Sequence, residues 1–278
     1  RCRRKAWLDR HGNPAERRWT AHRNLLLDDQ QRSFVALIPR KPGHGMAACA
    51  AGADAVVGLR LKGLGPSGEP LEAHPPLLRR VKGQSRWGDF AYQPVLERQG
   101  RRNTREHQLP LALMALLLEQ HQQGAVPSML VLGGGGRRLE QERIHFSNGL
   151  RKQLADGLRK LRADLARPVP PPLAADRRKC SLCSWRMACN AVAAEEGHLS
   201  EVSGIGAKRR EMLLELGIGG LSDLAAADPL QLAERLKRFG DQHGEVAESL
   251  VAQAKAQRDG RVERLDDATA LPELQACP

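Results

Sequence analysis

Three cysteines, Cys180, Cys183 and Cys189, lie within ten residues of one another. A close pair followed by a third thiolate has the spacing of a metal centre, but a tetrahedral centre needs a fourth ligand. Cys2 is the leading candidate, because a distant N-terminal cysteine would complete a four-thiolate shell and join the two ends of the first domain. Four thiolates suit either zinc or an iron-sulfur cluster.

A second motif, near residue 200, is a Gly-hydrophobic-Gly turn followed by three cations. Glycines let a chain approach a phosphate closely, and the free amides at the start of a helix donate hydrogen bonds to it. The turn and its countercharges are Gly204, Ile205, Gly206, Lys208, Arg209 and Arg210. This segment resembles the helix-hairpin-helix motif, and a weaker second hairpin is predicted at 236–254. Such contacts read the backbone of a nucleic acid, so binding should be sequence-independent and salt-dependent.

The composition also favours a polyanion as partner. The chain has 278 residues, a net charge of +12 and a sequence pI near 10.0, so its surface should attract nucleic acid. Aromatic residues make up only 3% of the chain, which argues against recognition by rows of stacked rings. Without a membrane-length apolar run or a signal-peptide core, we expect a cytoplasmic protein and no membrane partner. A reducing cytosol disfavours disulfides, and the spacing of Cys49 and Cys277 indicates no ligand role.

The elements that must position these motifs alternate between strand and helix before the cysteine triplet. Short β-type apolar runs predict strands, and longer periodic stretches predict helices. We expect strands at 32–40, 54–61, 89–98 and 127–132, and helices at 105–123 and 139–165. Prolines between residues 168 and 172 mark a linker, since proline cannot continue a helix. Leucine-rich sequence from His198 onward predicts a second, helical domain behind an α/β core.

The arrangement of these parts resembles the iron-sulfur members of the RecB-like PD-(D/E)xK nuclease family. The resemblance rests on the N-terminal Cys2-Arg-Arg-Lys-Ala-Trp-Leu, the cysteine triplet and the strand-helix unit between them. It implies a restriction-endonuclease-like α/β core with a mixed sheet over residues 1–190, closed by a [4Fe-4S] cluster on Cys2, Cys180, Cys183 and Cys189. It also implies a small all-α helix-hairpin-helix domain at 196–258 and a tail at 259–278. On this resemblance an iron-sulfur cluster is preferred to zinc.

The resemblance also provides a test of the nuclease site. The family holds Mg²⁺ or Mn²⁺ with an Asp and an Asp/Glu, and a Lys positions the attacking water. In this chain Pro76 and Leu96 occupy the positions of the two carboxylates, and Arg98 replaces the lysine. Gln108 retains the Gln of the family's helical motif. The substitutions predict a degenerate catalytic site.

A displaced site is the alternative. A one-residue slip would recruit Glu97, with Asp89 as its partner, although alternation along a strand turns Glu97 away from the face that Leu96 and Arg98 share. We therefore expect a DNA-binding member of the family that serves repair or recombination, with a helicase or another repair protein as partner. Two other functions stay open: an active iron-sulfur DNA exonuclease using the displaced site, and a zinc-stabilised nucleic-acid-binding scaffold. Mg²⁺ or Mn²⁺ is expected only in the active enzyme.

Overall fold

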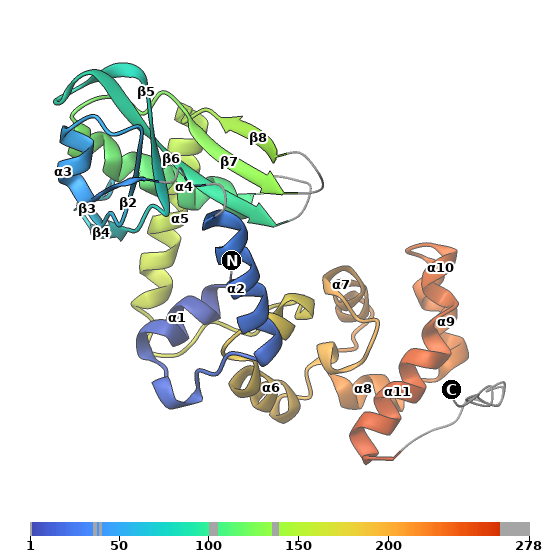
Figure 1. Ribbon diagram of the computed structural model, residues 1–278. Helices are drawn as coiled ribbons and strands as arrows, with labels where there is room; N and C mark the ends of the chain where they lie inside the picture. The colour runs from blue at the N-terminus through green and yellow to red at the C-terminus, as the bar shows by residue number, and fades with distance from the viewer. Residues whose placement is uncertain (1, 36–37, 39–40, 100–104, 135–138, 262–278) are drawn as a thin grey trace, which may run out of the picture. The chain divides into compact units, whose positions relative to one another are not determined.

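The chain divides into two compact units in a computed structural model that describes residues 2–35, 38, 41–99, 105–134 and 139–261 (Figure 1). One unit comprises residues 21–170. The other comprises residues 2–20 together with the chain from residue 171 onward, so the N-terminal segment belongs with the cysteine triplet. The predicted division differs from this one, because it assigned both cysteine segments to the first domain. None of the described helices is both long and apolar enough to cross a membrane.

A mixed six-stranded sheet forms the first unit, in the order β1-β2-β5-β6-β7-β8. Strands β1 and β2 pair in parallel, as do β6 and β7, and the other neighbours are antiparallel. Strands β3 and β4 form a separate antiparallel pair. The strands are β1 (Gly43–His44), β2 (Ala55–Val57), β3 (Leu61–Leu64), β4 (Pro70–Ala73), β5 (Leu77–Ser85), β6 (Gly88–Gln99), β7 (Met129–Gly134) and β8 (Leu139–Ile144). The predicted α/β core with a mixed sheet is confirmed at this level.

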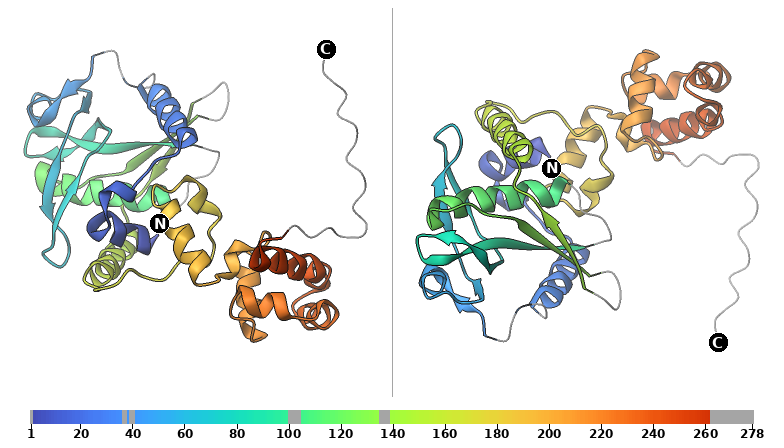
Figure 2. Two further views of the ribbon diagram at one scale, coloured as in Figure 1. Left: turned by 90° about the horizontal axis from the view of Figure 1, so that it is seen from below. Right: turned by 90° about the horizontal axis from the view of Figure 1, so that it is seen from above.

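Helices cover both faces of this sheet. They are α2 (Ala21–Val35), α3 (Gly45–Ala50), α4 (Arg105–Gln122) and α5 (Asn148–Leu165). Figure 2 shows α4 and α2 on opposite faces. A hydrophobic core lies on each face of the sheet, and β6 contributes to both because its side chains alternate between the faces. Tyr92 packs with the leucines of α4, and Val95 packs with Phe34 of α2. The side chains of β6 therefore point alternately toward α4 and toward α2.

Three predicted elements are confirmed as β6, α4 and β7, and three others need correction. The strand predicted at 32–40 is wrong over 32–35, where α2 continues, and residues 36–37 and 39–40 lie outside the described part. Gly58, with a φ of +68°, divides the strand predicted at 54–61 into β2 and β3. The helix predicted from residue 139 is the edge strand β8 followed by α5. Its charged residues suggested a helix, but charges are also usual on edge strands.

Helices alone form the described part of the second unit. They are α1 (Arg3–His11), η1 (Pro14–Glu16), η2 (Arg178–Leu182), α6 (Arg186–Glu195), η3 (Leu199–Glu201), α7 (Ala207–Glu215), α8 (Leu221–Ala226), α9 (Pro229–Lys237), α10 (Asp241–Gly244) and α11 (Ala247–Asp259). One core joins η3 to α7, α8, α9 and α11, and it includes the buried Leu213, Leu224 and Leu250. The predicted tail lies outside the described residues from 262 onward.

Candidate functional site

The N-terminal segment packs against the loop that carries the cysteine triplet. Trp185, only 1% exposed, donates from Nε1 to Oδ1 of Asp9 over 2.8 Å. The amide of Arg18 donates to the carbonyl of Ser184 over 2.9 Å. Gly12 lies so close to the Trp185 ring that an added Cβ would be 2.7 Å from it. These contacts hold residues 2–20 beside the cysteine loop.

The thiols of the four predicted ligands influence one another. Burial raises the pKa of Cys180, and the negative charges of Cys183 and Cys2 raise it further. Burial also raises the pKa of Cys189, with Cys183 and Cys180 adding to the effect. Cys2 caps α1, where its sulfur accepts a hydrogen bond from the backbone amide of Lys5 over 3.4 Å. Yet no group of three or more His, Cys, Asp or Glu side chains is arranged to hold a metal ion among the described residues.

Two buried arginines provide the charge that a thiolate centre needs. Arg177 acts on Cys180, and Arg4 acts on Cys189, each by a hydrogen bond and by its charge. In both cases the arginine lowers the thiol pKa, against the larger effect of burial. A centre with four thiolates around one zinc ion carries excess negative charge, which nearby guanidinium groups offset. The four thiols and their cationic neighbours thus have the chemistry of a thiolate site, whereas their described positions do not form an assembled ligand set.

The predicted phosphate-binding turn joins η3 to α7. Gly204 has a φ of +81°, in the left-handed region that residues other than glycine rarely adopt. Ile205 is 7% exposed and anchors the turn in the helical core. Gly206 caps α7 with an ordinary φ of −91°, so its backbone does not require glycine.

The amides of this turn are available to a ligand. No side chain caps α7, and the amides of Gly206, Ala207 and Lys208 donate to no residue that the structure describes. A second glycine-rich turn, at 217–220, precedes α8 and differs. There the amides of Gly219 and Gly220 both donate to Oδ2 of Asp223, over 2.9 and 3.1 Å. Only the first turn leaves its amides open.

The three predicted countercharges have different surroundings. Lys208 is exposed and its side chain contacts no described acceptor. Arg209 donates from Nη1 to the carbonyl of Gly204 and so closes the turn. Arg210 lies near His198, whose pKa is lowered by burial first and by the charge of Arg210 second. Lys208 is therefore the cation best placed to meet a phosphate.

In the first unit, the two positions assigned to nuclease carboxylates lie one residue beyond the last paired residues of β5 and β6. Strands β5 and β6 pair Leu77 with Val95, and continuing this antiparallel register by one residue places Pro76 opposite Leu96. Cross-strand neighbours have Cα atoms about 5 Å apart, a spacing at which two carboxylates could share one metal ion. Neither side chain has an oxygen. Arg98 follows on β6, but its side chain lies outside the described part.

The displaced site is not supported by its geometry. Asp89 and Glu97 lie eight residues apart on the single strand β6, which separates them by roughly 26 Å. Asp89 instead accepts a hydrogen bond from Gln84 over 2.9 Å. Asp29 of α2 is close enough for its charge to act on Glu97, an interaction that the sequence did not indicate. Burial and the charge of Asp29 raise the pKa of Glu97, whose Oε2 is buried without a described partner.

Gln108, the remaining predicted catalytic residue, lies half-buried in α4. Comparison of the chain with models of known protein families finds no match, and comparison with curated proteins also finds none. The function must therefore be argued from the residues and their geometry.

Proposed function

We propose that this chain is a sequence-independent DNA-binding protein of RecB-like nuclease ancestry that acts in DNA repair or recombination. Its second unit binds the DNA backbone through a helix-hairpin-helix turn and carries a thiolate-ligated centre, for which a [4Fe-4S] cluster is preferred. Its first unit has the degenerate remains of a PD-(D/E)xK site. Cys2, Cys180, Cys183 and Cys189 would hold the cluster, which would stabilise the fold without taking part in binding chemistry.

The open amides of the first glycine-rich turn carry the proposal. An α-helix N-terminus with unpaired amides and a partial positive charge binds phosphate oxygens well. Lys208 adds a full charge at the same end of α7. The second turn supports the same argument by contrast, because the Asp223 carboxylate already occupies its amides and would repel a phosphate.

The facing pair Pro76 and Leu96 supports a degenerate nuclease site. Pro76 immediately precedes β5 and Leu96 lies near the end of β6, so the two positions lie at one end of neighbouring strands, as a shared metal site would require. A divalent ion needs oxygen ligands, which proline and leucine side chains lack. Asp29 and Glu97 do not replace them, because no group of three or more acidic, His or Cys side chains among the described residues is arranged to hold a metal ion.

Lys208→Gln is expected to reduce the salt dependence of DNA binding. Loss of one phosphate contact should lower the slope of log K against log salt by about 0.9. The measurement is a titration of the full chain against duplexes of unrelated sequence over a series of salt concentrations. Lys152→Gln, which removes an exposed lysine from α5, is the matched control and should leave the slope unchanged. Weak, salt-insensitive binding by the native chain would contradict the proposed function.

The native chain should bind DNA without cleaving it in the presence of Mg²⁺ or Mn²⁺. Labelled single strands and duplexes, incubated with each ion and with a chelator, should give the same products. Pro76→Asp combined with Leu96→Asp, with or without Arg98→Lys, would return two oxygen ligands to facing positions and is expected to restore metal-dependent cleavage. Strong cleavage by the native chain that Glu97→Gln abolishes would instead establish the active nuclease.

A further inference from the structure

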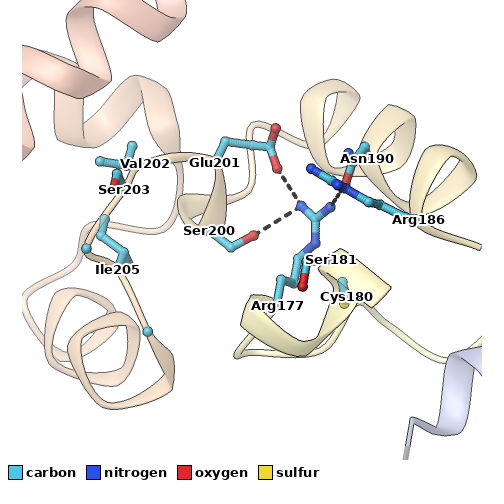
Figure 3. Close-up of a pocket in the computed structure, with 12 residues that line it drawn as sticks. Arg177, Cys180, Ser181, Arg186, Asn190, Ser200, Glu201, Val202, Ser203 and Ile205 are labelled. Carbon is cyan, nitrogen blue, oxygen red and sulfur yellow. Dashed lines mark hydrogen bonds and ion pairs between the residues drawn. The ribbon is translucent and has the colours of Figure 1, made fainter. Parts of the chain in front are cut away.

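A cavity of about 480 Å³ lies within the second unit, between the cysteine loop and the glycine-rich turn (Figure 3). Residues of η2 and α6 line one side, and residues 200–206 line the other. The volume is far greater than the roughly 30 Å³ that one water molecule occupies, and it falls in the range of small-ligand sites. The cavity therefore has room for a phosphate and its sugar.

One cation that lines this cavity has no ion-pair partner among the described residues. Arg177, with a side chain only 7% exposed, is held by Glu201, Ser200 and Asn190, as Figure 3 shows. The ion pair between Arg177 and Glu201 neutralises the charge of the Glu201 carboxylate. The guanidinium of Arg186 also lines the cavity, is exposed, and pairs with no residue that the structure describes. Arg186 is thus an exposed cation of the cavity that an anion can meet.

Two further features point to an anion. The Nε of Arg177 is buried and has no acceptor among the described residues, an arrangement that buried donors rarely adopt without a ligand or water. The hydroxyl-bearing side chain of Ser203 lines the same space and can donate to phosphate oxygens. The cavity thus combines a fixed guanidinium, an unpaired guanidinium and a small donor, and guanidinium groups are the preferred partners of phosphate.

The turn of the proposed DNA-binding site forms the rim of the cavity. Gly204 and Gly206 line it, so a phosphate on the α7 amides would lie at its entrance. Nucleotides follow one another by only about 3.4 Å of helix axis along a strand. Arg186 lines the same cavity as these glycines, so it is the cation that a neighbouring phosphate of the same strand would meet.

We propose that this cavity binds a second backbone phosphate of the nucleic-acid strand that the glycine-rich turn holds. The inference rests on the proposed function and extends it, because it makes the cysteine loop part of the DNA contact. Arg186 is the binding cation. Arg177 is a positioning residue, which holds η3 and α6 around the site.

The first test removes the unpaired cation. Arg186→Gln should weaken binding of a duplex by on the order of tenfold at low salt and lower the salt slope by about 0.9. Arg10→Gln, at an exposed arginine of α1 outside the cavity, is the control and should leave both quantities unchanged. Unchanged iron, sulfide or zinc content and an unchanged melting temperature would exclude indirect effects through the cysteine centre.

A second pair of variants adds a charge. Ser203→Asp places a carboxylate in the cavity and should weaken binding at least as much as Arg186→Gln. Ser222→Asp adds the same charge after the second glycine-rich turn and should have little effect. If Arg186→Gln and Ser203→Asp both bind the duplex with native affinity and native salt slope, the inference is overturned. Lys208→Gln, tested in parallel, would still report on the proposed function.

A free nucleotide is the competing occupant. A nucleoside monophosphate, titrated alone and as a competitor of duplex binding, should show no saturable binding that depends on Arg186. Saturable binding that Arg186→Gln abolishes would assign the cavity to a small molecule and overturn its role in holding a strand.

Discussion

Cys183→Ala is expected to remove the metal from the purified protein and to unfold its second unit at temperatures where the native chain is folded. A preformed site rarely exists in an unfolded chain, so the binding free energy of a structural metal becomes folding free energy, about 10–16 kcal/mol in zinc-finger peptides. The centre would also close the long loop between Cys2 and Cys180. Closing this loop reduces the conformational entropy of the unfolded chain. Anaerobic purification with iron, sulfide and zinc analysis, followed by thermal unfolding, measures both effects.

Cys49 offers the matched control for this substitution. It is fully buried in the first unit, and burial raises its pKa to about 11, so it is a neutral thiol in an apolar core. Cys49→Ala should keep the full metal content and lose only on the order of 1 kcal/mol of stability. Cys2→Ala should behave like Cys183→Ala. Full metal content in Cys2→Ala would remove Cys2 from the ligand set, and four-cysteine zinc without iron would favour the zinc scaffold.

The cysteine centre and DNA binding should fail together. Arg177 and Arg186 both belong to the cysteine loop, and the hydrogen bonds of Arg177 reach Ser200 and Glu201 immediately before the glycine-rich turn. Loss of the centre would release these arginines as well as the loop. Cysteine variants should therefore bind DNA more weakly than Arg186→Gln does, although their substitutions remove no charge that faces a phosphate.

Local patterns predicted the parts of this fold that depend on local sequence. The alternation in β6, the long apolar period of α4 and the glycines of the turn each specify their own structure. The predictions for the segments that form helix α2 and strand β8 were wrong, because tertiary packing decided the structure of these segments. Phe34 is half-buried against the sheet from helix α2, and the charges of 139–144 suit an edge strand as well as a helix.

The site was predictable as a set of motifs but not as a set of contacts. The cysteine spacing indicated the triplet and Cys2, yet nothing in the sequence associates Arg177 with Glu201 or Glu97 with Asp29. Those pairs depend on how elements distant along the chain pack. The cavity was missed for the same reason, because its lining comes from two segments with separate sequence signals.

Gly206→Val should reduce DNA affinity about 10- to 100-fold while the protein stays folded. Gly206 has a φ that any residue adopts, so a larger side chain does not strain the backbone of the turn. It does occupy the space above the open amides of α7, where the phosphate must approach. Loss of a hydrogen bond to a charged group costs about 1.5–3 kcal/mol, which sets the expected range.

Gly219→Val is the matched control, at the corresponding glycine of the second turn. The amide of Gly219 already donates to Asp223, so a side chain there displaces no phosphate. Gly204→Ala is expected to behave differently from both. Its φ of +81° would strain any other residue by roughly 1 kcal/mol, so stability and binding should fall together.

Equilibrium binding of one duplex and thermal unfolding, measured on all three variants, separate the alternatives. If the first turn holds the DNA backbone, Gly206→Val loses affinity at a native melting temperature, and Gly219→Val retains affinity. Equal losses at Gly206 and Gly219 would mean that both turns bind or that the substitutions act through folding, which the melting temperatures decide. Native affinity in Gly206→Val would move the binding site away from the turn, because a phosphate hydrogen-bonded to the α7 amides leaves no room for a valine side chain.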